Sequence, residues 1–85
     1  MIYVIELTKS AEKDILKLPI REQLKITKSL KSLETNPRPV GVKKLRGEIN
    51  LYRIRIGDYR AIYTIAEKIK LVSVYKVGHR KDIYD

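Results

Sequence analysis

The sequence contains no cysteine, and this absence rules out two ways of holding a small protein together. No disulfide framework can form, and no thiolate can bind a metal. The chain also has only one histidine, so it lacks the clustered nitrogen and sulfur ligands of a zinc site. We therefore predict a protein with no metal site and no cofactor.

Long apolar runs are missing as well. No stretch approaches the ~20 apolar residues that are needed to cross a bilayer. Residues 1–15 have no basic segment ahead of their short apolar run, which excludes a signal peptide. Repeats, low-complexity segments and linkers are also absent. We expect a single cytoplasmic domain spanning residues 1–85, without contact to a membrane.

Positive charge is the most prominent feature that is present. Nineteen Lys and Arg residues against ten Asp and Glu residues give a net charge of +9. Residues 37–66 alone hold seven basic and two acidic groups, and so carry +5. Such a charge on a small domain indicates a polyanionic partner, nucleic acid first. The alternative is a solvated basic surface that only keeps the protein soluble.

The first half of the chain predicts a strand followed by two helices. The β-branched and apolar run at 2–7 is typical of a strand, and Thr8 is placed to cap the helix that follows. Pro19 ends this helix and opens a second one over about 20–34, and the two form an αα-hairpin that stops at the prolines of 36–41. The apolar faces of the two helices comprise Ala11, Ile15, Leu18, Leu24, Ile26, Leu30 and Leu33.

The second half predicts three strands, at 51–56, 59–66 and 69–77. A two-residue Gly57-Asp58 turn joins the first two, because glycine readily supplies the positive φ that such a turn needs. The fold class is therefore α+β. It comprises an N-terminal strand, an αα-hairpin and a three-stranded antiparallel meander, with both helices packed on one face of the sheet.

The two-residue turn also fixes which side chains share a face. It pairs Arg55 with Arg60 and puts Arg53 on the same side, while the other face is uncharged and should meet the helices. Like charges that face each other across two strands are destabilising, and a phosphate held between them would remove the repulsion. The alternative is that these arginines pair with carboxylates elsewhere in the chain. The predicted core face consists of Tyr52, Ile54, Ile56, Tyr59, Ala61, Tyr63 and Ile65.

The C-terminal residues 77–85 add further candidates. Gly78 is expected to break the last strand and to turn the chain back over the open face. His79 and Arg80 follow it, and Tyr84 lies four residues beyond Arg80.

Three segments in combination resemble the RelE family of bacterial and archaeal toxins. They are KKLRG (43–47), LYRIRIGDYRAIY (51–63) and VGHRKDIY (77–84), and the likeness spans nearly the whole chain. It implies a RelE-like fold and a ribosome-dependent endoribonuclease that cuts mRNA in the decoding site without a metal. It also implies a RelB-like antitoxin, acidic or partly disordered, that silences the toxin in a hetero-oligomer.

The resemblance assigns roles to residues that match the family pattern. Its catalytic candidates are Arg53, Arg55, Arg60, Arg80, Tyr84 and, less directly, His79, at a position where residue types vary in the family. Its further RNA-binding candidates are Lys43, Lys44, Arg46 and Lys81. The sequence departs from longer members by ending one residue after Tyr84, where those members continue into a helix.

The expected reaction is attack of the RNA 2′-hydroxyl on the adjacent phosphate. Arg60 and Arg80 suit the phosphate and its developing charge, and Arg53 and Arg55 suit the backbone. Tyr84 could stack on a base or transfer a proton. His79 could act as acid or base, contact RNA, or bond to the backbone. Two other functions stay open, namely a ParE-like toxin that poisons gyrase and an RNA-binding module without catalysis.

Overall fold

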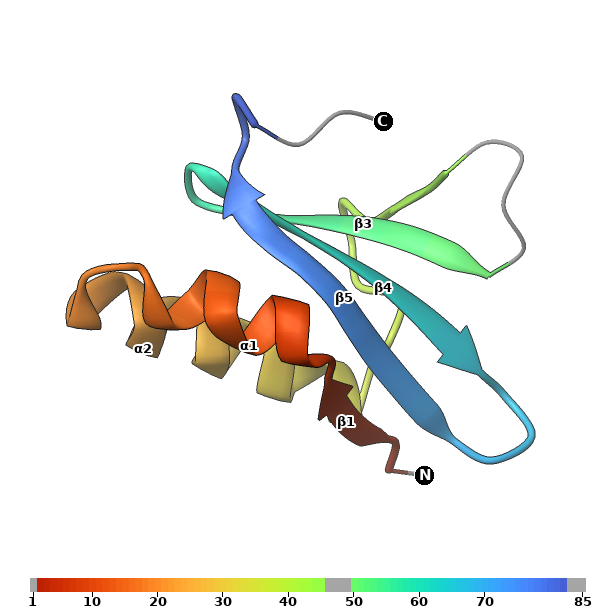
Figure 1. Ribbon diagram of the computed structural model, residues 1–85. Helices are drawn as coiled ribbons and strands as arrows, with labels where there is room; N and C mark the ends of the chain where they lie inside the picture. The colour runs from red at the N-terminus through yellow and green to blue at the C-terminus, as the bar shows by residue number, and fades with distance from the viewer. Residues whose placement is uncertain (1, 46–49, 83–85) are drawn as a thin grey trace.

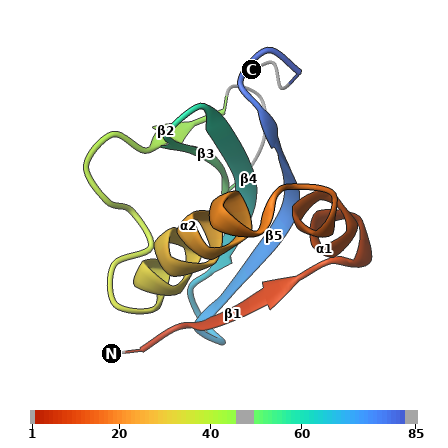
Figure 2. The same ribbon diagram turned by 90° about the vertical axis from the view of Figure 1, so that its left-hand side faces the viewer.

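The computed structural model describes residues 2–45 and 50–82. They form one mixed sheet with the strand order β1-β5-β4-β3-β2. Two helices lie side by side on one face of that sheet (Figures 1 and 2). The elements are β1 (Val4–Leu7), α1 (Lys9–Leu16), α2 (Ile20–Lys31), the 3₁₀ turn η1 (Ser32–Glu34), β2 (Lys43–Lys44), β3 (Leu51–Ile56), β4 (Tyr59–Ala66) and β5 (Leu71–His79). The predicted α+β class and the placing of both helices on one face are confirmed.

Local sequence signals account for the helical hairpin. The Thr8 hydroxyl accepts a hydrogen bond from the Ala11 amide at 3.2 Å, which confirms the predicted cap of α1. Pro19 stands immediately before α2 and has an extended backbone, with φ −56° and ψ 149°. The Gln23 side chain donates to the Leu18 carbonyl at 2.8 Å and so closes the junction between the helices.

The core lies between the helices and the sheet. All members of the predicted core face of β3 and β4 are buried except Tyr59, which is half-buried. From the helices, Ala11, Ile15, Ile26, Leu30 and Leu33 are buried, and Leu18 packs partly against them. The prediction was wrong for Leu24, which is 66% exposed on the outer side of α2.

The sheet has two strands beyond the predicted meander. The β3–β4 and β4–β5 pairings are antiparallel, as expected. The N-terminal strand β1 then joins the far side of β5 in parallel, and the two-residue β2 extends the opposite edge beside β3. The strands of these two pairs, β1 with β5 and β2 with β3, are not joined by short turns. The local sequence therefore carries no signal for either pairing.

Two buried tyrosines form hydrogen bonds with the segment that connects η1 to β2. The Tyr63 hydroxyl donates to the Pro37 carbonyl at 2.7 Å, and Arg38 Nε donates to the Tyr52 hydroxyl at 3.1 Å. The two rings stack with their centroids 5.9 Å apart. Burial raises the pKa of Tyr63 well above its ordinary value, which keeps this hydroxyl a donor.

Glu67, in the turn between β4 and β5, interacts with Tyr3 near the N-terminus and with Arg38 in the segment before β2. Its carboxylate accepts a hydrogen bond from the Tyr3 hydroxyl at 2.7 Å and pairs with Arg38 Nη2 at 2.6 Å. Lys70 Nζ lies 4.0 Å from Glu67 Oε2. The bond from Tyr3, followed by that from Arg38, lowers the pKa of Glu67 below its ordinary value. We call Tyr3, Arg38 and Glu67 the polar latch.

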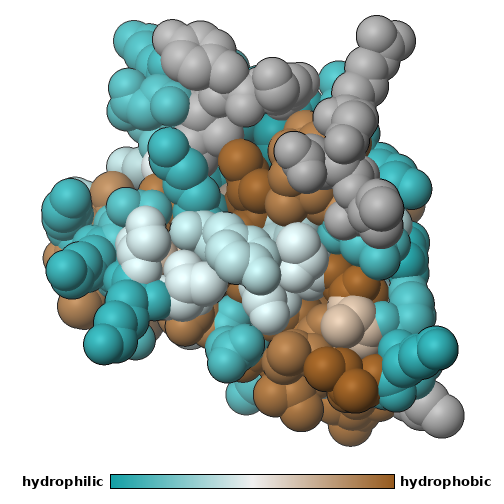
Figure 3. All heavy atoms as spheres, turned by 45° about the vertical axis from the view of Figure 1, so that its right-hand side comes forward, coloured by the Kyte–Doolittle hydropathy of each residue, from teal (hydrophilic) through white to brown (hydrophobic). Residues whose placement is uncertain are grey.

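Exposed apolar side chains gather at the end of the molecule that holds the N-terminus and the β4–β5 turn (Figure 3). Ile2, Val4 and Ile69 are each more than three-fifths exposed there. None of the helices within residues 2–45 and 50–82 is both long and apolar enough to span a membrane.

Candidate active site

The β3–β4 hairpin carries the predicted arginine pair. Arg55 is paired with Arg60, and Arg53 with Ile62. These residues alternate with the buried core face, so they point away from the helices. The predicted register of this hairpin is confirmed residue by residue.

Strand β2 brings a lysine to the same side. Lys43 is paired with Arg53, while Lys44 is paired with Tyr52 and therefore belongs to the helix side. Of the two predicted lysines on β2, the structure thus places one beside the arginines. We call Lys43, Arg53, Arg55 and Arg60 the basic face.

The arginines of the basic face differ in their surroundings. Arg53 is only 8% exposed, and its burial, followed by the positive charge of Arg60, lowers its pKa. Even so, arginine stays protonated in proteins, so Arg53 serves as a fixed cation. Arg55 is exposed and donates from Nε to the Gly57 carbonyl at 3.1 Å. Arg53 and Arg60 each have a further interaction partner as well.

The C-terminal segment approaches the basic face at the hairpin turn. The Arg80 amide donates to the Asp58 carbonyl at 2.8 Å, which places Arg80 at the end of the sheet that holds Arg55 and Arg60. The expectation that Gly78 breaks the last strand was wrong, because β5 continues through it to His79. Gly78 pairs with Arg60, and the chain turns only after the strand has ended.

His79 does not join the arginines in this register. It is paired with Tyr59, whose side chain lies on the helix side, and the two rings meet edge to face at 5.6 Å. Its Nδ1 accepts a hydrogen bond from the Lys81 amide at 3.2 Å. Lys81 itself is exposed in the turn that follows β5. Two other candidates, Arg46 and Tyr84, lie outside the described residues.

Arg38, one of the seven basic residues in the stretch 37–66, does not belong to the basic face. Arg38 belongs to the polar latch on the helix side, and its hydrogen bonds to Tyr52 and Glu67 raise its pKa. Conversely, the sequence reasoning missed Lys76, which is exposed on β5 opposite Ile62. Its place next to the basic face depends on the register of β5, which shifts by one residue between the pairings of Tyr63 and Ile62.

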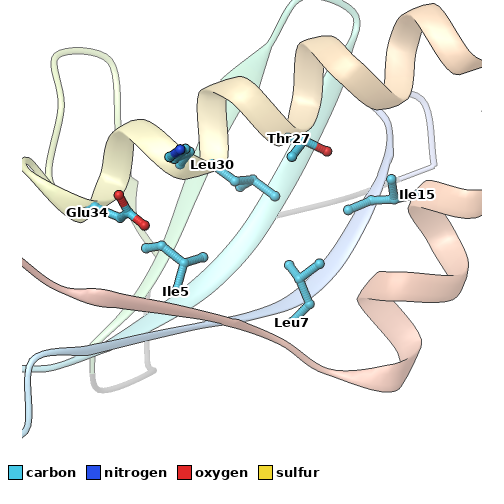
Figure 4. A pocket seen from close by; sticks show the side chains of 7 residues that line it. Ile5, Leu7, Ile15, Thr27, Leu30 and Glu34 are labelled. Carbon is cyan, nitrogen blue, oxygen red and sulfur yellow. The ribbon is translucent and has the colours of Figure 1, made fainter.

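A separate hollow of about 220 Å³ lies on the helix side of the sheet (Figure 4). Ile5 and Leu7 of β1 form one wall, and Leu30 of α2 faces them across it. Its lining is mostly apolar and contains none of the predicted site residues. Across the described parts of the chain, no three His, Asp or Glu side chains group closely enough to hold a metal ion.

Comparison with known proteins places this architecture in a family. Residues 5–84 match the family model of the ParE toxin of the type II toxin–antitoxin system parDE. A putative toxin RelE1 of Methanocaldococcus jannaschii is 30% identical over 87 residues, covering 99% of this chain and 97% of its own. Toxin RelG of Mycobacterium tuberculosis is 35% identical over 86 residues, covering 99% and 98%.

A solved structure agrees with the sequence comparisons. The archaeal RelE–RelB complex from Pyrococcus horikoshii OT3 contains a chain that superposes with a TM-score of 0.84 at 32% identity, covering 98% of this chain and all of that one. The family match and these relatives span nearly the whole sequence, in agreement with the resemblance of its three segments. The chain therefore belongs to the RelE/ParE superfamily and is a toxin of a toxin–antitoxin system.

Proposed function

We propose that this toxin is a metal-independent endoribonuclease that cuts mRNA on the ribosome and so stops translation. The observation that carries the proposal is the placing of Arg55 directly opposite Arg60, beside the buried cation Arg53, on the sheet face that the helices leave uncovered. Such crowding of like charge costs stability, and a bound phosphate backbone offsets that cost. Forked guanidinium groups suit phosphate oxygens in particular.

The reaction we infer begins with the RNA 2′-hydroxyl. Its oxygen attacks the neighbouring phosphorus, the bond to the 5′-oxygen breaks, and the products are a 2′,3′-cyclic phosphate and a 5′-hydroxyl. A base must take the 2′ proton, and an acid must supply one to the 5′-oxygen. Arg60 and Arg80 would bind the phosphate and stabilise its developing negative charge, while Arg53 and Arg55 would hold the backbone.

The proton transfers need a group other than arginine, because guanidinium is a poor acid and base at neutral pH. Tyr84 is our first candidate, with stacking on a base as its alternative role. His79 is the second, but its register on the helix side and its bond from Lys81 favour a supporting role for it at the end of β5. Lys43, Arg46 and Lys81 would add salt-sensitive contacts to RNA, whereas Lys44, on the helix side of the sheet, would add only to the general positive charge.

The same basic face suits an inhibitor of opposite charge. The archaeal relative was solved in complex with RelB, and we infer a RelB-like antitoxin here as well. An acidic, partly disordered segment that folds on binding would neutralise the +9 chain and cover its arginines. We place both partners, the antitoxin and the mRNA in the ribosomal decoding site, in the cytoplasm.

A second function has one observation in its favour. The family model that matches residues 5–84 is that of the ParE toxin, and ParE-like toxins poison DNA gyrase through protein contacts. Such toxins generally lack the full arginine and tyrosine set, whereas Arg60, Arg80 and Tyr84 are all present here. This difference favours the nuclease.

Expression without antitoxin separates the two functions. Wild type and an Arg60→Ala/Arg80→Ala variant are induced, and mRNA 5′ ends are mapped across the transcriptome. Growth arrest with codon-phased cuts that vanish in the variant would support the nuclease. Arrest with intact mRNA and a DNA damage response would instead support the gyrase poison, and cleavage that requires Mg²⁺ or leaves a 5′-phosphate would contradict the mechanism.

A further inference from the structure

Strand β5 contains a bulge beside the basic face. Ile62 of β4 is paired with Lys76, but the next residue, Tyr63, is paired with Val74. Tyr75 is therefore an extra residue with no partner on β4. In such a bulge the regular alternation of side chains is interrupted, and two neighbouring residues can point to the same side.

The bulge presents two consecutive side chains to solvent. Val74 and Val77 on either side of it are 0% and 3% exposed, whereas Tyr75 is 46% exposed and Lys76 is also exposed. Regular alternation would have turned one of the middle pair into the core. Tyr75 is the one tyrosine in residues 2–45 and 50–82 whose side chain is neither buried nor half-buried.

Helix α1 holds the bulge in place. The Thr8 hydroxyl, at the start of this helix, donates to the Tyr75 carbonyl at 3.4 Å. The Asp14 carboxylate accepts a hydrogen bond from the Val77 amide at 3.1 Å, which supplies a partner where β1 no longer runs beside β5. The bulge is thus tied to the helix on both sides, so the two exposed side chains project from a fixed backbone.

Its position makes the bulge an extension of the basic face. Lys76 lies directly across from Ile62, and Arg53 flanks Ile62 on its other side. The diagonal relation between Lys76 and Arg60 corresponds to about 7–8 Å between backbones. Gly78, opposite Arg60, adds no side chain to separate the lysine from the arginines.

We propose that Tyr75 and Lys76 form a nucleotide subsite that flanks the arginines, with a base stacked on the Tyr75 ring and its phosphate bound by Lys76. The proposal rests on the RNA-directed function inferred above and extends it to a residue pair outside the predicted site. An aromatic platform beside a track of cations is the usual way to bind single-stranded RNA without reading its sequence. The subsite would therefore set affinity for one nucleotide next to the cleaved bond rather than codon choice.

Equilibrium binding of a dye-labelled single-stranded RNA tests the subsite. A 2′-O-methyl group on every ribose of the probe prevents cleavage by 2′ attack, so affinity alone is measured. Tyr75→Phe keeps the ring and should bind within about twofold of wild type. Tyr75→Leu removes the ring and should bind about tenfold more weakly, as expected for the loss of one stacked base. Lys76→Gln should weaken binding and lower the slope of log affinity against log salt by about one.

Matched controls lie on the helix side. Leu24→Ala removes an exposed apolar side chain from α2, and Lys28→Gln removes an exposed charge there. Neither should alter affinity by more than about twofold, apart from the loss of long-range attraction that follows when Lys28→Gln removes one positive charge. Thermal unfolding of every variant confirms that the folded state is being compared.

The outcomes separate the subsite from the function it rests on. If Arg60→Ala abolishes binding while Tyr75→Leu binds like wild type, the subsite is wrong and the RNA-directed function stands. Equal losses in Tyr75→Phe and Tyr75→Leu would also refute stacking. If Tyr75→Leu weakens binding of the antitoxin but not of RNA, the pair serves the protein partner instead. A wild type that binds no free RNA at all would overturn the subsite, whereas loss of mRNA cleavage on ribosomes would overturn the function on which it rests.

Discussion

Arg55 and Arg60 face each other across the β3–β4 hairpin, although a pair of opposite charges would stabilise the same position. Cross-strand pairs of this kind are each worth about 0.2–1 kcal/mol, and like charges act against folding. A two-residue turn fixes the register, so the two arginines cannot slip apart without exposing the core face. The residue scale thus shows two like charges held in register at the position where we place phosphate.

Other single residues serve stability instead. The Tyr63 hydroxyl is buried and donates to the Pro37 carbonyl. Tyr63→Phe should lower the free energy of unfolding by about 1–2 kcal/mol, because it leaves that carbonyl without its donor. Urea denaturation measures the effect. The control Tyr75→Phe, at an exposed ring, should stay within about 0.5 kcal/mol of wild type, and an equal loss in both variants would contradict the assigned bond.

At the scale of elements, the β3–β4 turn depends on glycine. Gly57 has φ +61°, and an added Cβ would come within 2.5 Å of Lys25 Nζ. Gly57→Ala should therefore cost about 1–2 kcal/mol of unfolding free energy, mostly from the left-handed backbone, since the lysine side chain can move away.

Gly57→Asn is the matched control, because asparagine tolerates this backbone better than alanine does. It should recover part of the loss in the same denaturation experiment. If alanine proves as stable as glycine, the turn geometry described here is wrong.

The polar latch makes the stability of the folded protein depend on pH in the acidic range. Because hydrogen bonds lower the pKa of Glu67 in the folded state, its contribution is fully present above the unfolded-state pKa of about 4.3. That contribution is lost as the pH falls through the lower, folded-state pKa. Urea unfolding at pH 7, 4 and 3 should thus show a smaller acid-induced loss in Glu67→Gln than in wild type.

Tyr3→Phe provides a graded comparison, since the Tyr3 hydroxyl is the main cause of the shift. Its acid-induced loss should fall between those of wild type and Glu67→Gln. Identical pH profiles in all three proteins would show that the latch does not contribute to stability.

Elements whose sequence signals lie within a few residues could be predicted, whereas contacts between distant segments could not. The cap at Thr8 and the Gly57-Asp58 turn act over a few residues, so the first helix and the arginine register could be predicted from pattern alone. The parallel pairing of β1 with β5, the bulge at Tyr75 and the Arg38–Glu67 ion pair join distant segments. Nothing in the neighbouring residues signals such contacts, and they were missed.

Across the whole molecule, both helices cover one side of the sheet (Figure 2), and the basic face lies on the other side. The helices bury the apolar side, which leaves the other side to Arg53, Arg55, Arg60 and Lys43. A net charge of +9 attracts polyanions from a distance, and this attraction weakens as salt rises. Placement on one face, rather than net charge alone, is what a nuclease would need.

Cleavage of mRNA on purified ribosomes tests this claim most directly. Wild type is compared with Arg60→Ala and with Arg21→Ala, which removes the same charge from the exposed side of α2. We predict that wild type and Arg21→Ala cut the message to leave a 5′-hydroxyl, and that Arg60→Ala is slower by a factor of about 100 or more, as is typical for the loss of one group that stabilises transition-state charge. Equal rates for Arg60→Ala and Arg21→Ala would show that the basic face does not carry the chemistry.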